Sequence, residues 1–231
     1  MHKYDFLDWI ASSPDTPVQT LVKLSDDEDW EAREAVAKNL GTPVNILARL
    51  STDEHPDVRW NVANNPNTPV DLLVKLSDDE NFCVRCNVAN NTCTPLDILE
   101  KFSTDENSDV RRAIAYNPHT PVDVLVKLSS DKDWGVRYRV ANHPNTPVDV
   151  LVKLSTDEDW DVRWNVADNP NTPVDVLVKL STDENIDVRI AVAKNPHTPV
   201  NILTNFWNED NEDYEKEYKD YVEYKDYCYG K

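Results

Sequence analysis

The chain has 231 residues and carries 24 basic against 43 acidic side chains, which gives a formal net charge of −19. Such a charge repels DNA and anionic membranes, because both need neutralising lysine and arginine, so we expect neither as a partner. No apolar run approaches the roughly 20 residues of a transmembrane helix. The start, Met1 to Asp5, lacks the features of a signal peptide, and we expect a cytoplasmic protein.

A repeat dominates the sequence. Thr-Pro pairs recur every 26 residues, and they begin at Thr16, Thr42, Thr68, Thr94, Thr120, Thr146, Thr172 and Thr198. So regular a period predicts an array in which each repeat packs on its neighbours. We therefore divide the chain into a degenerate N-terminal half-repeat cap (1–15), seven repeats (16–197), and a degenerate C-terminal capping repeat with an acidic, tyrosine-rich tail (198–231).

The first helix of each repeat is expected to begin at the Thr-Pro pair, as at Thr172 and Pro173. Threonine suits the N-cap, and proline suits the first helical position. Val174, Leu177 and Leu180 follow at intervals of three and predict an apolar face. This spacing is compatible with an α-helix and with a partly 3₁₀ helix.

The second helix is expected to begin after an Asp, Asn or His cap, at Asp29, His55, Asn81, Asn107, Asp133, Asp159 and Asn185. Val162, Val166 and Ala167 then form one apolar face, and Asn169-Pro170 ends the helix. Both helices span about two turns, which is marginal for an isolated helix in water, so stacking must stabilise them.

The repeat core V-R-x-x-V-A-x-N-P-x-T-P-x-x-x-L-x-x-L, as it runs from Val162 to Leu180, resembles the leucine-rich repeat variant family over about residues 16–205. The resemblance implies a right-handed superhelix of alternating α- and 3₁₀-type helices, an α-solenoid without enzyme activity. The founding member is linked to an iron–sulfur cluster on an N-terminal cysteine-rich segment, but no cysteine here precedes Cys83. The repeat is also similar to HEAT repeats, where an Asp six positions before an Arg builds a ladder; Asp157 and Arg163 share that spacing.

An arginine recurs once per repeat, and an aspartate lies six positions before each one. A basic stripe for nucleic acid and a structural Asp–Arg ladder between repeats both fit, and the acidic net charge favours the ladder. The pairs are Asp27 and Arg33, Asp53 and Arg59, Asp79 and Arg85, Asp105 and Arg111, Asp131 and Arg137, Asp157 and Arg163, and Asp183 and Arg189.

The acidic turn around Asp157, Asp159 and Asp161 resembles the start of a calcium loop. It lacks the glycine at the sixth position and the closing glutamate, which favours helix capping.

Cysteines cluster in one repeat at Cys83, Cys86 and Cys93, with Cys228 far along the chain. Together they could bind zinc or an iron–sulfur cluster, although no fourth ligand lies nearby in the sequence. We therefore expect no cofactor, and metal binding stays an alternative.

No Ser–His–Asp or Cys–His pattern predicts catalysis, and the few glycines exclude a glycine-rich phosphate loop. We predict a non-enzymatic scaffold that binds a protein partner on its concave repeat face. The alternatives are a metal or iron–sulfur protein and an acidic nucleic-acid mimic. The columns of Trp164, Asn165 and Asp168 vary between repeats and should be exposed; their aromatic and arginine members are the predicted contacts: Trp60, Arg112, Tyr116, Tyr138, Arg139 and Trp164.

Overall fold

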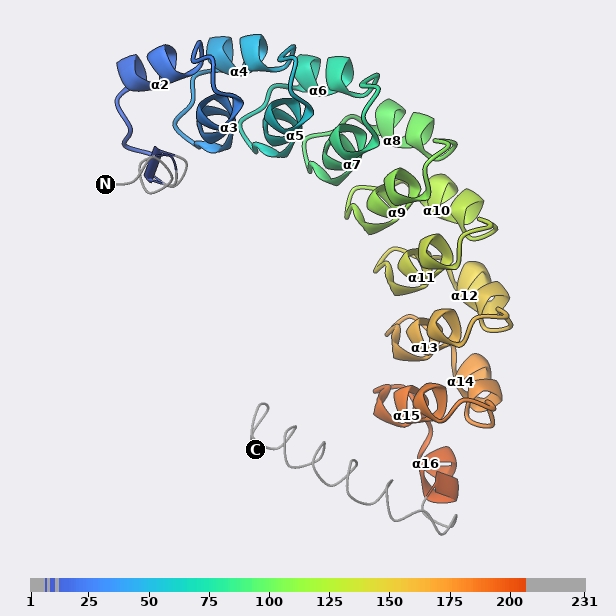
Figure 1. Ribbon diagram of the computed structural model, residues 1–231. Helices are drawn as coiled ribbons and strands as arrows, with labels where there is room; N and C mark the ends of the chain where they lie inside the picture. Colours follow the sequence, from blue (N-terminus) through green and yellow to red (C-terminus); the bar gives the residue numbers. More distant parts are fainter. Residues whose placement is uncertain (1–6, 8, 11–12, 207–231) are drawn as a thin grey trace. The chain divides into compact units, whose positions relative to one another are not determined.

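The computed structural model describes residues 7, 9–10 and 13–206. In this part every regular element is an α-helix, and helices of seven and nine residues alternate along the chain (Figure 1). The first helices of the repeats are α2 (Val18–Leu24), α4 (Val44–Leu50), α6 (Val70–Leu76), α8 (Leu96–Phe102), α10 (Val122–Leu128), α12 (Val148–Leu154), α14 (Val174–Leu180) and α16 (Val200–Phe206). The second helices are α3 (Trp30–Lys38), α5 (Pro56–Asn64), α7 (Phe82–Asn90), α9 (Ser108–Tyr116), α11 (Trp134–Asn142), α13 (Trp160–Asp168) and α15 (Ile186–Lys194). The fold is the expected all-α array of helix pairs, and no described helix has the length and apolar character needed to cross a membrane.

Each first helix begins at a proline. Pro43 is the N-cap of α4, and its carbonyl accepts from the N–H groups of Ile46 (2.9 Å) and Leu47 (3.1 Å). Bonds of the 3₁₀ type therefore occur at the helix start, while α4 as a whole is α-helical. The predicted threonine cap is wrong by one residue, because the Thr42 hydroxyl donates instead to the Val36 carbonyl (2.6 Å) at the end of α3.

The buried face of the first helix also differs from the expectation. In α14, Val176, Leu177 and Leu180 are buried, whereas Val174 and Val178 are 47% and 43% exposed. An α-helix turns about 100° per residue, which carries Val174 away from the side of Leu180. The prediction that Val174 shares that face is wrong, and a row of exposed valines covers the first helices.

The second helices follow the expected pattern. Each begins after the predicted Asp, Asn or His, whose side chain accepts a main-chain N–H; Asp159, for example, accepts from Asp161 (2.9 Å). Val162, Val166 and Ala167 are wholly buried. Within the described residues these caps and this apolar face confirm the sequence interpretation.

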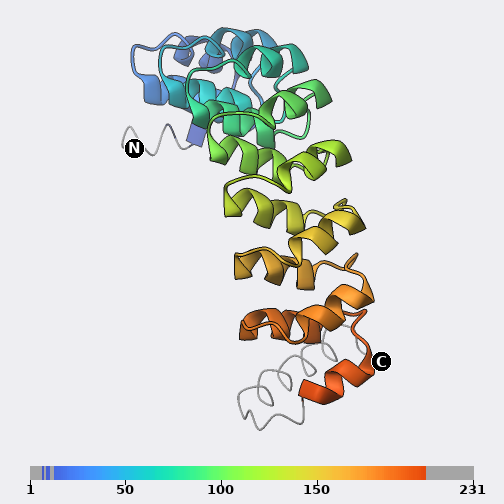
Figure 2. The same cartoon turned by 90° about the vertical axis from the view of Figure 1, so that its right-hand side faces the viewer.

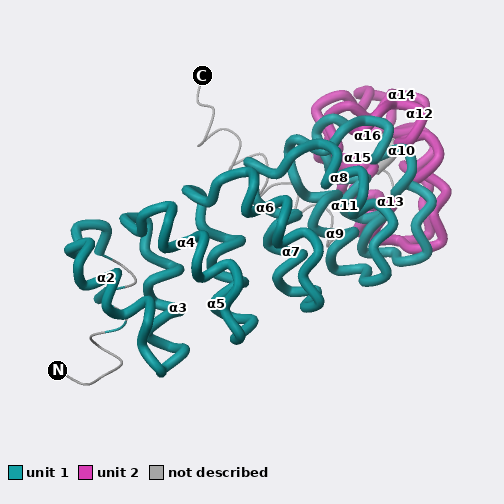
Figure 3. Tube along the Cα trace, turned by 90° about the horizontal axis from the view of Figure 1, so that it is seen from above, with its two compact units in different colours: residues 1–145 teal, residues 146–231 magenta. Residues whose placement is uncertain are grey.

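The repeats fall into two compact units, residues 1–145 and 146–231, which are coloured separately in Figure 3. In unit 1 the closest packing between repeats joins consecutive second helices, from α3 to α11, and these lie on the inner side of its curve (Figure 1). In unit 2, α13 packs on α15, with α12 and α14 in a separate layer (Figure 1); Figure 2 shows the cartoon turned by 90°. The second helices therefore form a continuous layer within each unit, and this layer carries the candidate site.

Candidate functional site

The residues predicted to contact a partner all lie on second helices. The Asp168 column is exposed in every repeat, and Tyr116 in that column is 62% exposed. The Trp164 column is half-buried throughout. Unit 1 holds five of the six residues, on α5, α9 and α11, and unit 2 holds the sixth on α13: Trp60, Arg112, Tyr116, Tyr138 and Arg139, then Trp164.

The Asn165 column contradicts the prediction that it is exposed. Asn165 is 1% exposed and Asn61 is 2% exposed. The Asn87 side chain donates to the Trp60 carbonyl in the preceding repeat (3.0 Å), and Asn61 donates to Glu34 (3.1 Å). Second helices pack so closely that this column lies between them, where its amides satisfy polar groups of the neighbouring repeat.

Arg112 joins α9 to α11. Its guanidinium donates to the carboxylate of Asp133 (3.2 and 3.3 Å) and pairs with Asp109 on its own helix (3.1 Å). Gly135 leaves room for it, since an added Cβ would lie 2.7 Å from Nε of Arg112. Burial raises the pKa of Asp133, but the hydrogen bond and charge of Arg112 outweigh burial and hold that pKa below its usual value. The Arg112 guanidinium is thus paired with two carboxylates.

The Arg139 guanidinium contacts two aromatic rings in the same layer of helices. Its guanidinium carbon is 5.0 Å from the ring centroid of Tyr116 and 5.6 Å from that of Tyr138. Trp134, which is 50% exposed, meets the Tyr138 ring edge-on with centroids 6.2 Å apart. Cation–π contact stabilises such a guanidinium while its edge stays available. We call Tyr116, Trp134, Tyr138 and Arg139 the Arg139 cluster.

The recurrent arginines form the predicted structural ladder. Arg111 makes a forked pair with Asp131 of the next repeat (2.6 and 2.9 Å), and it also donates to the main-chain carbonyl of Asp105 (2.7 Å). The aspartate six positions before each arginine thus contributes only its main-chain carbonyl. The carboxylate that pairs with the arginine belongs to the aspartate 20 positions after it. The same fork links Arg33 to Asp53, Arg59 to Asp79, Arg85 to Asp105, and Arg163 to Asp183.

The ladder carboxylates are held by guanidiniums, as Asp131 is held by Arg111. Burial raises the pKa of Asp131, but the hydrogen bonds from Arg111 and from the Asp133 main chain outweigh burial and lower it overall. Such guanidiniums are not available as a basic stripe for nucleic acid.

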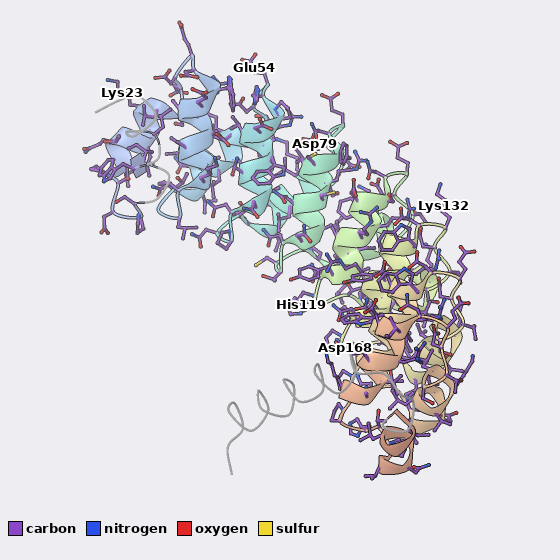
Figure 4. The ribbon with its side chains drawn as sticks, turned by 60° about the horizontal axis from the view of Figure 1, so that its bottom comes forward. Lys23, Glu54, Asp79, His119, Lys132 and Asp168 are labelled. Carbon is purple, nitrogen blue, oxygen red and sulfur yellow. The ribbon has the colours of Figure 1, made fainter. Side chains whose placement is uncertain are left out.

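The acidic turns serve capping in the way the sequence favoured. Asp157 accepts from the Asp159 main chain (3.0 Å), and Asp159 accepts from that of Asp161. The side chains of Glu54, Glu80 and Glu184 in these turns are exposed, and Glu54 lies at one edge of the second helices in Figure 4.

A second ladder consists of asparagines, and in unit 1 it lies near His119, at the edge away from Glu54 in Figure 4. The Asn65 amide donates to the carbonyls of Ala37 (2.9 Å) and Asn39 (3.1 Å), and its oxygen accepts from Asn67 (3.0 Å). Sequence reasoning assigned this column only to ending the helix. The available signal was a polar residue of one type at the same position in almost every repeat. Equivalent bonds are made by Asn39, Asn91, Asn117 and Asn195.

His143 takes the place of asparagine in this ladder. Its Nδ1 accepts from the Asn145 main chain (3.1 Å), so Nε2 carries the proton and donates to the Asn117 carbonyl (3.0 Å). The residue is 3% exposed, and burial lowers the pKa of the imidazole. A neutral histidine therefore reproduces the acceptor and donor of the amide.

Replacing His143 by asparagine should make the protein less sensitive to mild acid, because one source of acid destabilisation is then absent. The folded pKa is lowered, so as pH falls below the unfolded value of about 6.5 the unfolded chain takes up a proton that the folded chain refuses. Stability is present above that value and is lost toward the folded pKa. Measured by circular dichroism between pH 7.5 and 5, Tm should fall further in the parent than in His143→Asn. Equal falls would show that the folded histidine accepts the proton.

The cysteines do not form a metal site in the described part of the chain. No group of three or more histidine, cysteine, aspartate or glutamate side chains there could hold an ion. Cys83 and Cys86 are half-buried, Cys93 is exposed, and Cys228 lies outside the described residues. Burial and the nearby Asp109 charge raise the pKa of the Cys86 thiol to about 12, so it stays protonated at neutral pH, whereas a metal ligand must be a thiolate.

Comparisons with known proteins agree with this architecture. The model of the family described as leucine rich repeat variant matches residues 56–81, 109–133, 134–159 and 160–185. The chain is similar to the solved structure described as a leucine-rich repeat variant with a novel repetitive protein structural motif, at 28% identity and a TM-score of 0.61, over 81% of this chain and 79% of that one. An engineered protein is similar at 21% identity with a TM-score of 0.41, over 81% of this chain and 71% of its own. No curated protein matches the chain.

Proposed function

This chain is a helical solenoid of the leucine-rich repeat variant kind, and from that premise we propose that it is a non-enzymatic scaffold which binds a protein partner on the second-helix face. Stacked repeats offer extended surfaces for protein recognition. The observation that carries the proposal is the Arg139 cluster, where Tyr116 and Arg139 replace the Asn, Asp, Lys or Ala that other repeats have at these two positions.

The composition of the cluster supports a protein partner. Tyrosine, tryptophan and arginine are the residues most enriched among those that dominate binding energy at protein interfaces. Trp134 and Tyr116 are 50% and 62% exposed, although each could contribute a large apolar area to a core. The exposed parts of these rings add little to the stability of the fold, and a partner that covers them would gain their burial energy on binding.

The two alternative functions have weaker support. The cysteines of one repeat lack a cluster of ligands in the described residues. For an acidic nucleic-acid mimic, many of the carboxylates would have to be free to imitate phosphates. Asp53, Asp79, Asp105, Asp131 and Asp183 are instead held by arginines of the ladder. The excess of acid is thus partly structural.

Two substitutions test the proposed face. Partners captured from the native host by the whole chain are identified by mass spectrometry, and their affinity is measured by calorimetry. Tyr138→Ala and Trp164→Ala should each weaken binding by about 2 kcal/mol, because each removes an aromatic anchor. Tm should change little, since both side chains are half-buried rather than core.

Val126→Ala is the matched control. Val126 lies on α10 in the other layer of helices and is 43% exposed, so its truncation should leave affinity unchanged. If Tyr138→Ala and Trp164→Ala bind normally while removal of the residues after Asn208 abolishes binding, the acidic tail, which lies outside the described residues, is the binding element instead.

A further inference from the structure

Arg139 departs from its own column. In other repeats this position holds a buried asparagine or alanine packed between second helices, as at Asn61, Asn87 and Asn165. Arg139 is half-buried, and its guanidinium lies beside the rings of Tyr116 and Tyr138. Arg139 is charged and does not pack between helices as the asparagines do. Its role therefore differs from that of the other residues at this position.

The guanidinium of Arg139 has no acceptor among the described residues. Every other arginine in that part of the chain donates to a carboxylate or to a main-chain carbonyl, including Arg137, which reaches the Asp131 carbonyl (2.9 Å), and Arg189, which reaches that of Asp183 (2.7 Å). The two contacts of Arg139 are with ring faces, which leave the N–H groups along the guanidinium edge unused.

No acidic side chain on α9 or α11 is left to pair with Arg139. Helix α11 contains no acidic residue, and the one on α9, Asp109, pairs with Arg112 (3.1 Å). Asp133, which precedes α11, accepts from Arg112 and from the main chain of Val136. In a chain of net charge −19, Arg139 is thus a cation whose charge is left for a partner.

We propose that Arg139 anchors the partner by binding the carboxylate of an aspartate or glutamate side chain, with an adjoining apolar residue of the same segment packed on Trp134. This inference rests on the proposed function and names the chemistry of its ligand. A guanidinium fork matches a carboxylate with two parallel hydrogen bonds. Contact with the two tyrosine rings restricts the side chain beforehand, so less entropy is lost on binding.

A single negative charge fits this site better than a phosphate group. A phosphorylated residue carries about −1.5 to −2 charges at neutral pH, which calls for more than one cation. The second guanidinium nearby, that of Arg112, is already held by Asp133 and Asp109. One free fork therefore selects a monoanionic carboxylate.

The test uses the whole chain, labelled with ¹⁵N, and two unlabelled peptides. One peptide has the sequence Ser-Gly-Glu-Leu-Ser-Gly-Glu-Leu-Ser-Gly with blocked ends, and the other has glutamine in place of each glutamate. Titration is followed at the Nε–H resonance that disappears in Arg139→Asn. We expect the glutamate peptide to shift this resonance saturably and to bind about tenfold more tightly than the glutamine peptide, a difference of about 1.4 kcal/mol.

Arg139→Asn introduces the asparagine that other repeats have at this position, as at Asn165. It should therefore keep the fold, and it is the control variant. Arg139→Asn should bind the two peptides with equal affinity. Arg139→Lys should lose most of the tenfold preference because lysine, although charged, cannot make the two parallel hydrogen bonds of a guanidinium. The inference is overturned if the glutamate peptide leaves the Arg139 resonance unmoved, or if Arg139→Asn keeps the preference. In either case the scaffold proposal survives as long as Tyr138→Ala still weakens the captured partner.

Discussion

Truncating Leu177 to alanine is expected to lower the free energy of unfolding by about 2–5 kcal/mol. Leu177 is wholly buried on α14, between Val176 and Leu180, which are also buried. Removing its side chain loses burial energy and leaves a cavity that short, proline-bounded helices cannot collapse around. Urea denaturation followed by circular dichroism measures the change.

Val178→Ala is the control for that loss. Val178 is the next residue along the same helix, and it is 43% exposed. Its truncation should change stability by less than about 0.5 kcal/mol, as surface substitutions generally do. A loss at Leu177 as small as that at Val178 would mean that the buried side of the first helix is assigned wrongly.

Replacing Arg163 by alanine should destabilise the array by about 3 kcal/mol. Arg163 forks onto Asp183 (2.7 and 3.0 Å) and donates to the Asp157 carbonyl (2.8 Å), and both charged side chains are below 10% exposed. The substitution leaves the Asp183 carboxylate buried without its cation. The loss is read from urea denaturation at neutral pH.

Acid should narrow the difference between Arg163→Ala and the parent. Burial raises the pKa of Asp183, but hydrogen bonds from Arg163 and the Asn185 main chain outweigh burial and lower it. A lowered folded pKa adds stability above the unfolded value of about 3.9, and this stability is lost as pH falls toward the folded pKa. As pH falls through this range, the free energy of unfolding therefore decreases more in the parent than in Arg163→Ala.

Glu184→Gln provides the matched control for the ladder. The Glu184 carboxylate lies 3.5 Å from the Arg163 guanidinium, but its side chain is 89% exposed, so this pair should contribute less than about 1 kcal/mol. If Arg163→Ala unfolds like the parent and instead loses affinity for the partner, the arginine column is a binding surface rather than a ladder.

The sequence predicted most of the second helix because local rules decide it. The caps from Asp29 to Asn185 satisfy N–H groups two or three residues away, and Val162 and Val166 share a face by helical spacing alone. It misplaced the start of the first helix. Threonine was expected to cap the helix that follows it, but the Thr42 hydroxyl donates to a carbonyl at the end of α3.

The candidate site could be predicted only in part for a related reason. The variable columns were identified by comparing repeats, yet Asn165 proved buried and Trp164 half-buried. Exposure on a second helix depends on how closely the neighbouring repeat packs. The sequence of a single repeat does not show how close the neighbouring second helix lies.

By itself the sequence determined the 26-residue period, the helix pair, the buried valines of the second helix, and the existence of an Asp–Arg ladder, since each follows from local hydrogen bonding or from side-chain periodicity. The tertiary structure alone decided which repeat supplies each carboxylate, that buried amides form a second ladder, and that Arg139 contacts the rings of two tyrosines. These features join residues about one repeat apart, so they depend on how adjacent repeats stack.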